Sequence, residues 1–144
     1  MRALRLWRHA GKDSALIFVL ADFLQPLTSS KMAKLLHRRI AQISHKAFPE
    51  EACGFVVDGK AIPVTNQADE PEGGFLISAQ DYLKYSTDVI FHSHPVGDHS
   101  FSEHDIVVSA NMELTSYLYV VEADRLEILS PAGQIETFEK VLNR

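Results

Sequence analysis

The residues best suited to chemistry are two histidines one residue apart, followed closely by an aspartate. His92 and His94 lie in a His-Ser-His-Pro motif, and Ser102-x-x-Asp105 begins after six more residues. Because residues i and i+2 of a strand point to the same side, both imidazoles can reach one ion. Asp105 would add an oxygen ligand from the first turn of the next helix. Two imidazoles and one carboxylate suit Zn²⁺ and leave its fourth position to water.

Plainer interpretations of the same residues remain open. A His-x-His pair also occurs on solvated strand ends. Ser102 and Asp105 have the types and spacing of the N-cap and third residue of a helix, which stabilise a helix start without any catalytic role. Capping and metal binding are compatible, since both place Ser102 at the start of a helix.

The segments around these residues alternate between helical and strand patterns. Residues 88–91, directly before His92, predict a buried strand, the kind of element at whose end binding sites are common. The helix after Ser102 shows an apolar stripe at helical spacing, made of Ile106, Val107, Ala110 and Leu114. The other predicted elements are a helix over 33–47, strands over 52–57, 61–65, 75–77, 117–121 and 125–129, and short helices over 78–85 and 135–142.

Together these elements predict one domain around a mixed sheet. With 144 residues, 46% of them hydrophobic, the chain suits one globular domain rather than two. Helices are interspersed with hairpins, such as the one turned by Asp58-Gly59, so the expected fold class is α+β with a three-layer α/β/α arrangement. Pro63 favours an edge or irregular position for its strand. The domain is expected to occupy residues 32–144.

Residues 1–31 form a basic N-terminal extension with no part in the predicted site. Their net charge is +3, whereas residues 32–144 carry −8. An acidic body repels phosphate backbones, so nucleic acid is not an expected partner. We expect the extension to be weakly structured or packed on a partner, and Met32 is an alternative natural start. The apolar run 15–24 resembles a signal peptide, but Asp22 interrupts it and it is shorter than the roughly 20 residues that a membrane span needs.

The single cysteine, Cys53, excludes internal disulfides and favours a reducing, cytoplasmic setting. It lies in an apolar strand, where burial as a packing residue is favoured over a role as a nucleophilic thiol. Gly54 beside it is expected to allow close packing. Four other histidines within residues 32–144 are expected on exposed surfaces or loops: His37, His45, His99 and His104, the last two with a contact to a metal ligand or substrate as the alternative.

The two motifs together resemble the signature of the JAMM zinc metalloproteases, also called MPN-plus or Mov34/MPN/PAD-1. That family has His-x-His-Pro followed by Ser-x-x-Asp, and an upstream glutamate in a Pro-x-Glu-x-Cys-Gly context in its prokaryotic and phage branches. Residues 49–54 read Pro-Glu-Glu-Ala-Cys-Gly. The resemblance covers residues 33–144 and implies a fold of the JAMM and cytidine-deaminase type.

The resemblance also implies a role for each motif residue. His92, His94 and Asp105 would bind Zn²⁺, and Ser102 would donate a hydrogen bond to the oxyanion of the tetrahedral intermediate. Glu51 would be the catalytic glutamate, because it stands two residues before Cys53. Glu50 is the alternative for that role.

The family's activities set the expected substrates. The leading hypothesis is hydrolysis of a peptide or isopeptide bond, at the C-terminus of a ubiquitin-like or sulfur-carrier protein. A phage tail-assembly peptidase and a non-catalytic MPN scaffold domain are the alternatives. Zinc nucleobase deaminases are excluded, because they need a Pro-Cys-x-x-Cys motif and this chain has one cysteine. The sequence predicts no oligomeric state.

Overall fold

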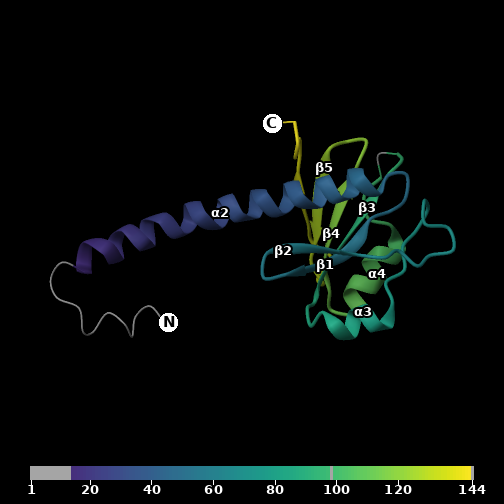
Figure 1. Ribbon diagram of the computed structural model, residues 1–144, viewed down its shortest axis with the longest axis horizontal. Coiled ribbons are helices and arrows are strands. Elements are labelled where there is room, and N and C mark those ends of the chain that lie inside the picture. Colours follow the sequence, from purple (N-terminus) through teal and green to yellow (C-terminus); the bar gives the residue numbers. More distant parts are fainter. Residues whose placement is uncertain (1–13, 98, 144) are drawn as a thin grey trace. The chain divides into compact units, whose positions relative to one another are not determined.

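A computed structural model describes residues 14–97 and 99–143 of the protein, and its side chains from residue 29 onward (Figure 1). The chain divides into two units between Ala33 and Lys34, and the second unit contains the whole sheet. The expectations for residues 1–13 lie outside the described residues. The elements are α2 (Ser14–Ala47), β1 (Cys53–Val57), β2 (Lys60–Val64), α3 (Ala79–Lys84), β3 (Val89–His94), α4 (Glu103–Asn111), β4 (Thr115–Val120), β5 (Arg125–Leu129) and β6 (Ile135–Phe138).

One six-stranded sheet has the order β2-β1-β3-β4-β5-β6. Only β3 and β4 pair in parallel, which α4 makes possible by crossing over between them, and every other neighbouring pair is antiparallel. The sheet is therefore mixed, as predicted. Pro63 lies on β2 at the edge of the sheet, where its missing N–H leaves no gap in the ladder.

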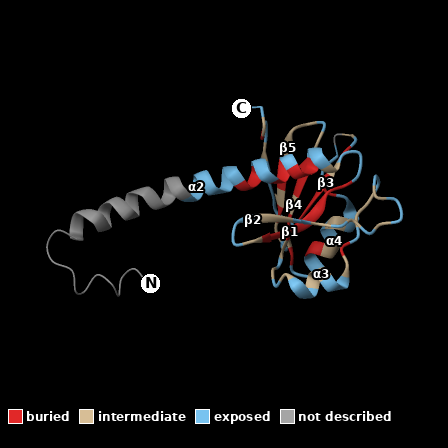
Figure 2. Ribbon diagram, viewed as in Figure 1, coloured by how far each residue is buried: buried red, intermediate tan, exposed pale blue. Residues whose placement is uncertain are grey.

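Helices cover both faces of this sheet. On one face, Leu36, Ile40 and Ile43 of α2 pack with Phe91 and Tyr119 in one core cluster. On the other face, Phe55 and Ile90 pack with Tyr82 of α3 in a second cluster. The buried residues follow the strands between the helices (Figure 2). The α+β class with three layers is confirmed.

Two segments differ from their predicted secondary structure. Residues 135–138 form strand β6, antiparallel to β5, whereas a helix was predicted. The turn before it is tight enough to fold the chain straight back, since the N–H of Ser130 donates to the carbonyl of Gln134 at 2.9 Å. Residues 75–77 form no strand. There the N–H of Leu76 donates to the side chain of Asn66 instead of to a neighbouring strand.

Helix α2 begins at Ser14, well before the predicted start at residue 33, and ends as predicted at Ala47. Its residue His37 is only 6% exposed, so the prediction that it faces solvent was wrong. The centroid of its ring lies 4.6 Å from the ring centroid of Phe138, because β6 lies beside this part of the helix. Within the part of the chain that the structure describes, no helix has the length and apolar character required to cross a membrane.

Helix α4 is rotated relative to its predicted orientation. The predicted stripe faces outward, with Ile106 38% and Val107 54% exposed, and Leu114 is buried only beyond the end of the helix. The inward face instead carries Asp105, Val108 and Ser109, which are spaced three and four residues apart. This face is set by Asp105, whose carboxylate turns toward the two histidines of β3.

Candidate metal centre and active site

Strand β3 places the two histidines on one face of the sheet. Alternation along the strand puts Ile90, His92 and His94 on the side of α3 and α4, while Phe91 packs on the side of α2. The strand is held between β1 and β4, with His92 opposite Cys53 on one side and Leu118 on the other. His92 is consequently 1% exposed and has little freedom to turn away from the site.

The first turn of α4 brings Asp105 to the same place through a capping box. The hydroxyl of Ser102 accepts a hydrogen bond from the N–H of Asp105 at 3.1 Å. In return, the N–H of Ser102 donates to Oδ2 of Asp105 at 3.0 Å. These reciprocal bonds fix the carboxylate and align the helix start with the histidines. Asp105 thus closes the capping box and also turns its carboxylate toward the two histidines.

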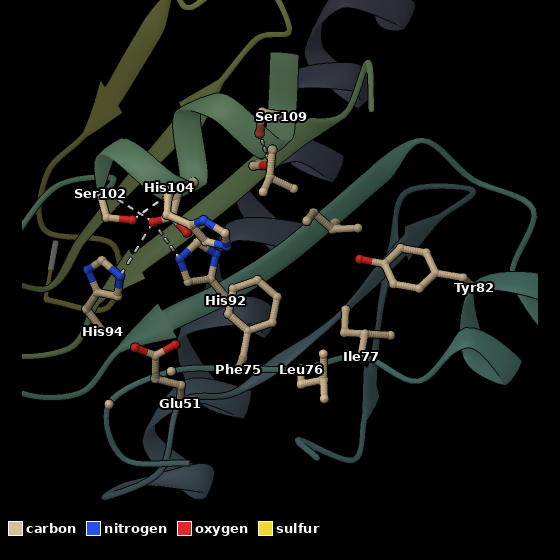
Figure 3. A pocket seen from close by; sticks show the side chains of 16 residues that line it. Glu51, Phe75, Leu76, Ile77, Tyr82, His92, His94, Ser102, His104 and Ser109 are labelled. Carbon is tan, nitrogen blue, oxygen red and sulfur yellow. Dashed lines mark hydrogen bonds and ion pairs between the residues drawn. The ribbon is translucent and has the colours of Figure 1, made fainter. Parts of the chain in front are cut away.

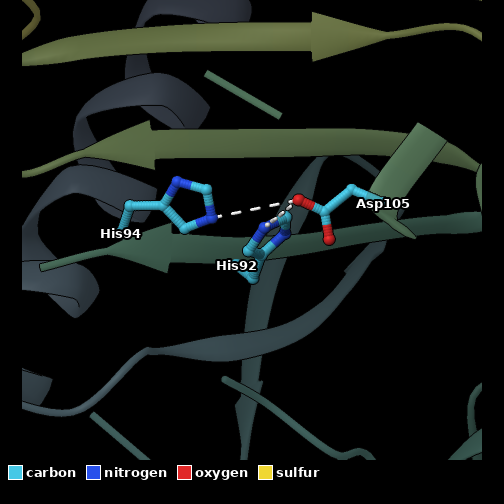
Figure 4. A group of neighbouring side chains, drawn as sticks. All are labelled: His92, His94 and Asp105. Atoms are coloured by element: carbon cyan, nitrogen blue, oxygen red, sulfur yellow. Dashed lines mark ion pairs between the residues drawn. The ribbon is translucent and has the colours of Figure 1, made fainter. Parts of the chain in front are cut away.

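Figure 4 shows His92, His94 and Asp105 converging on one point. Nε2 of His92 lies 3.4 Å from Oδ2 of Asp105, and Nε2 of His94 lies 3.9 Å from the same oxygen. One ligand atom from each residue lies within 4.8 Å of the others. Nε2 of His92 is buried and has no hydrogen-bond partner among the described residues. A cation at this point would satisfy that nitrogen, and the donor set of two imidazoles and a carboxylate fits Zn²⁺.

The electrostatics of the cluster favour the protonation states that bind metal. Burial lowers the pKa of His94, and the neighbouring His92 lowers it further, so the imidazole is neutral and can offer a lone pair. For Asp105, burial acts to raise the pKa, but the interaction with His92 and the bonds from Ser102 outweigh it. The pKa of Asp105 is therefore well below its ordinary value, and the carboxylate is ionised.

Glu51 lies beside this cluster, just before β1 (Figure 3). It is 7% exposed, whereas its neighbour Glu50 is exposed. Burial raises the pKa of Glu51 to about 7; His92 acts to lower that pKa and Asp105 to raise it. A carboxyl group with a pKa near neutrality can both accept and return a proton. Of the two glutamates, only Glu51 lines the cavity that contains the histidines and Asp105.

A cavity of about 450 Å³ opens onto the cluster and extends away from it between β3, α3 and α4. Its polar end carries Glu51, His94 and Ser102 (Figure 3). The ring of Phe75 stacks on the imidazole of His92 with centroids 4.6 Å apart and covers one face of that imidazole. Ser102 is an exposed residue that lines this end of the cavity, and its hydroxyl accepts a hydrogen bond from the N–H of Asp105.

The other singled-out residues lie as follows. Cys53 is 1% exposed and burial raises the pKa of its thiol to about 12, which agrees with a packing role and not with a nucleophile. A Cβ on Gly54 would collide with the carbonyl of Ile62 and the ring of Phe91, so close packing there is confirmed. His45, His99 and His104 are exposed, and His104 also lines the cavity.

Sequence reasoning missed Asn66, which organises the loop beside the site. Its side-chain nitrogen donates to the carbonyls of Glu51 at 3.0 Å and Gly74 at 2.9 Å. Its side-chain oxygen accepts from the N–H groups of Ala68 and Leu76 at 3.0 and 3.1 Å. A lone asparagine in a polar loop is ordinary in sequence, so no local signal marks this role.

The comparisons with known proteins agree with this architecture. The family model described as prokaryotic homologs of the JAB domain matches residues 33–130. The chain belongs to this family. The JAB-domain family includes zinc isopeptidases, and the resemblance to JAMM proteins noted from the motifs is thereby confirmed.

The fold of this JAB domain also occurs in a solved structure. The solution structure of protein DSY2949 from Desulfitobacterium hafniense aligns with a TM-score of 0.53 and 16% identity, over 72% of this chain and 86% of the other. At that identity the likeness concerns the fold alone. No curated protein matches the chain.

Proposed function

We propose that this JAB domain is a zinc-dependent metallopeptidase or isopeptidase. The observation that carries the proposal is the convergence of His92, His94 and Asp105 next to the buried carboxyl group of Glu51. A scaffold domain would have no need for a buried imidazole nitrogen that lacks a hydrogen-bond partner among the described residues, because such a group destabilises a folded protein.

Each residue has a defined part in hydrolysis. His92, His94 and Asp105 would hold Zn²⁺, which when bound supplies Lewis acidity and lowers the pKa of a water ligand to about 7. Glu51 accepts a proton from water as it attacks the substrate carbonyl, and passes the proton to the departing nitrogen. The hydroxyl of Ser102 donates a hydrogen bond to the developing oxyanion, a contribution of about 2.7–4 kcal/mol for a single donor of this kind.

For the substrate, we propose a peptide or isopeptide bond at the C-terminus of a ubiquitin-like or sulfur-carrier protein, as the family resemblance implies. An extended C-terminal tail suits a cavity that reaches the three proposed metal ligands and Glu51. We propose a cytoplasmic setting, which is consistent with a single, buried and unpaired cysteine.

Replacing Glu51 with Gln separates metal binding from hydrolysis. The variant should bind one equivalent of zinc like the wild type and lose peptide cleavage, because the amide cannot accept a proton. Zinc content by atomic emission and cleavage of a C-terminally extended Gly-Gly peptide are the two readouts. Glu50→Gln, which changes the exposed neighbour, is the matched control and should retain activity. Full activity in Glu51→Gln would refute the proposed mechanism.

A further inference from the structure

The end of the cavity farthest from Glu51 has the character of a side-chain pocket. Its walls come from four segments of the second unit: Ile77 before α3, Tyr82 on α3, Ile90 on β3 and Val108 on α4. Figure 3 shows His92 and Phe75 lying between the polar end and the end with Ile77 and Tyr82. The pocket therefore begins at a metal-ligating histidine and leads away from it.

Charge is unevenly distributed along this cavity. All of its ionised or basic lining residues lie on β3 beyond Ile90, at the start of α4, or just before β1: Glu51, His92, His94, His104 and Asp105. At the other end the polar atoms include the hydroxyls of Ser109 and Ser116, which lie 2.7 Å apart and bond to each other. A charged side chain placed there would find no partner of opposite charge among the described lining residues and would be unfavourable.

The side chains that line the pocket are fixed by core packing in the absence of a ligand. Ile77 and Ile90 are 5% and 3% exposed and belong to the core cluster that includes Phe55. The ring of Tyr82 packs against Phe55 edge-on, with centroids 5.3 Å apart. Because these contacts are part of the core, the space between them cannot close by a simple side-chain rotation. Pre-formed, mainly apolar pockets of about 300–1,000 Å³ are typical of ligand-binding sites.

We propose that this end of the cavity is a specificity pocket for an aliphatic side chain, of about leucine size, on a residue next to the scissile bond. The proposal rests on the function proposed above and adds a substrate class to it. Glycine would leave the pocket unfilled, so a bond flanked only by glycines would be a poor substrate. A Gly-Gly tail joined to an aliphatic residue would place that residue where the pocket can hold it.

Two valines on α4 provide a matched test. Val108 lines the pocket, whereas Val107 is 54% exposed and does not line it. Zinc-loaded wild type, Val108→Phe and Val107→Phe are assayed on peptides that differ only by Gly, Ala or Leu at each position flanking the cleaved bond. We expect the wild type to favour Leu over Gly at one flanking position by at least tenfold, since each methylene in an apolar pocket is worth about 10- to 200-fold. Val108→Phe should lose this preference, and Val107→Phe should keep it.

A binding experiment tests the pocket independently of catalysis. N-acetyl-leucine amide and N-acetyl-glycine amide are titrated into the metal-free protein while the methyl resonances of Ile77 and Ile90 are followed by NMR. Only the leucine compound should shift them, and Val108→Phe should abolish the shift. If the wild type cleaves no peptide but binds the leucine compound in this way, the peptidase proposal fails and the pocket stands.

Equal shifts of the methyl resonances with the two compounds, or equal cleavage of the Gly and Leu peptides, would overturn the proposal of a specificity pocket. Should Val108→Phe fail to fold, Ile77→Ala provides the opposite change, because it enlarges the pocket. That variant should shift the preference from Leu toward Phe. An unchanged preference in a folded Ile77→Ala protein would also overturn the proposal.

Discussion

The side-chain nitrogen of Asn66 donates a hydrogen bond to the carbonyl oxygen of Glu51 at 3.0 Å. The N–H of Glu51 also donates to the carbonyl of Pro71 at 2.7 Å, within the loop that Asn66 holds together. The main chain of the proposed catalytic glutamate is therefore bonded on both sides to one loop. Phe75, which stacks on His92, belongs to the same loop. The loop thus sets the position of the proposed base and covers one proposed metal ligand.

Replacing Asn66 with Ala should disturb Glu51 and the loop together. It leaves the carbonyls of Glu51 and Gly74 without their partner, so we expect a loss of about 1–3 kcal/mol in the free energy of unfolding. We also expect a lower kcat with unchanged zinc content. Urea unfolding, peptide-cleavage kinetics and metal analysis give these three values. Asn111→Ala, at the exposed end of α4, is the control and should behave like the wild type. A fully active and stable Asn66→Ala protein would contradict this role.

Two substitutions at Ser102 should separate helix capping from catalysis. Ser102→Ala removes the cap and the hydroxyl donor, so it should reduce both stability, by about 0.5–2 kcal/mol, and kcat. Ser102→Gly also removes the hydroxyl, yet glycine at an N-cap costs only a few tenths of a kcal/mol. Both variants should therefore show the same fall in kcat, with KM little changed, while only the alanine variant melts earlier. If activity followed stability across the pair, Ser102 would be a capping residue alone.

The stability of the metal-free protein should depend on pH through Glu51. Its pKa is raised mainly by burial, from 4.5 to about 7, so between these values the folded state keeps a proton that the unfolded state has released. The unfolded state then binds fewer protons, and the contribution of Glu51 to the unfolding free energy falls as the pH rises through this window. Above about pH 7 the contribution stays at its lower value.

Glu51→Gln removes this titration and leaves the other groups in place. In the presence of EDTA, the stability of the variant relative to the wild type should increase between pH 4.5 and about 7 and be constant outside that range. The lowered pKa of His94 acts in the opposite direction, but it is present in both proteins. Urea unfolding at a series of pH values gives the difference. A difference that does not vary with pH would show that Glu51 titrates normally.

Gly54→Ala should damage the strand pairs that carry the site. The added methyl group would collide with the carbonyl of Ile62 on β2 and the ring of Phe91 on β3, neither of which can withdraw easily. We expect a loss of at least about 1–3 kcal/mol in unfolding free energy, as in other overpacked cores. Gly73→Ala is the control, because a Cβ there meets nothing within 4 Å. Thermal unfolding of the two variants compares them directly, and equal melting temperatures would contradict the prediction.

The sequence alone determined those features that depend on local chemistry and spacing. Alternation along an extended strand put His92 and His94 on one side, and the types of Ser102 and Asp105 specified a capping box. The mixed sheet followed from strands separated by both hairpins and helices. The family followed from the motifs, because a metal centre needs particular residue types at fixed intervals.

Only the tertiary structure decided which faces are buried and which distant segments meet. The apolar stripe of α4 predicted the wrong inward face, since orienting Asp105 toward β3 rotates Ile106 and Val107 toward solvent. His37 is buried because residues 135–138 return as a strand, which a short mixed sequence after a turn does not reveal. Asn66 and Glu51 are fifteen residues apart, and their hydrogen bond depends on how a polar loop folds back. Such contacts between distant residues leave no periodic pattern, because periodicity records only the geometry of neighbours along the chain.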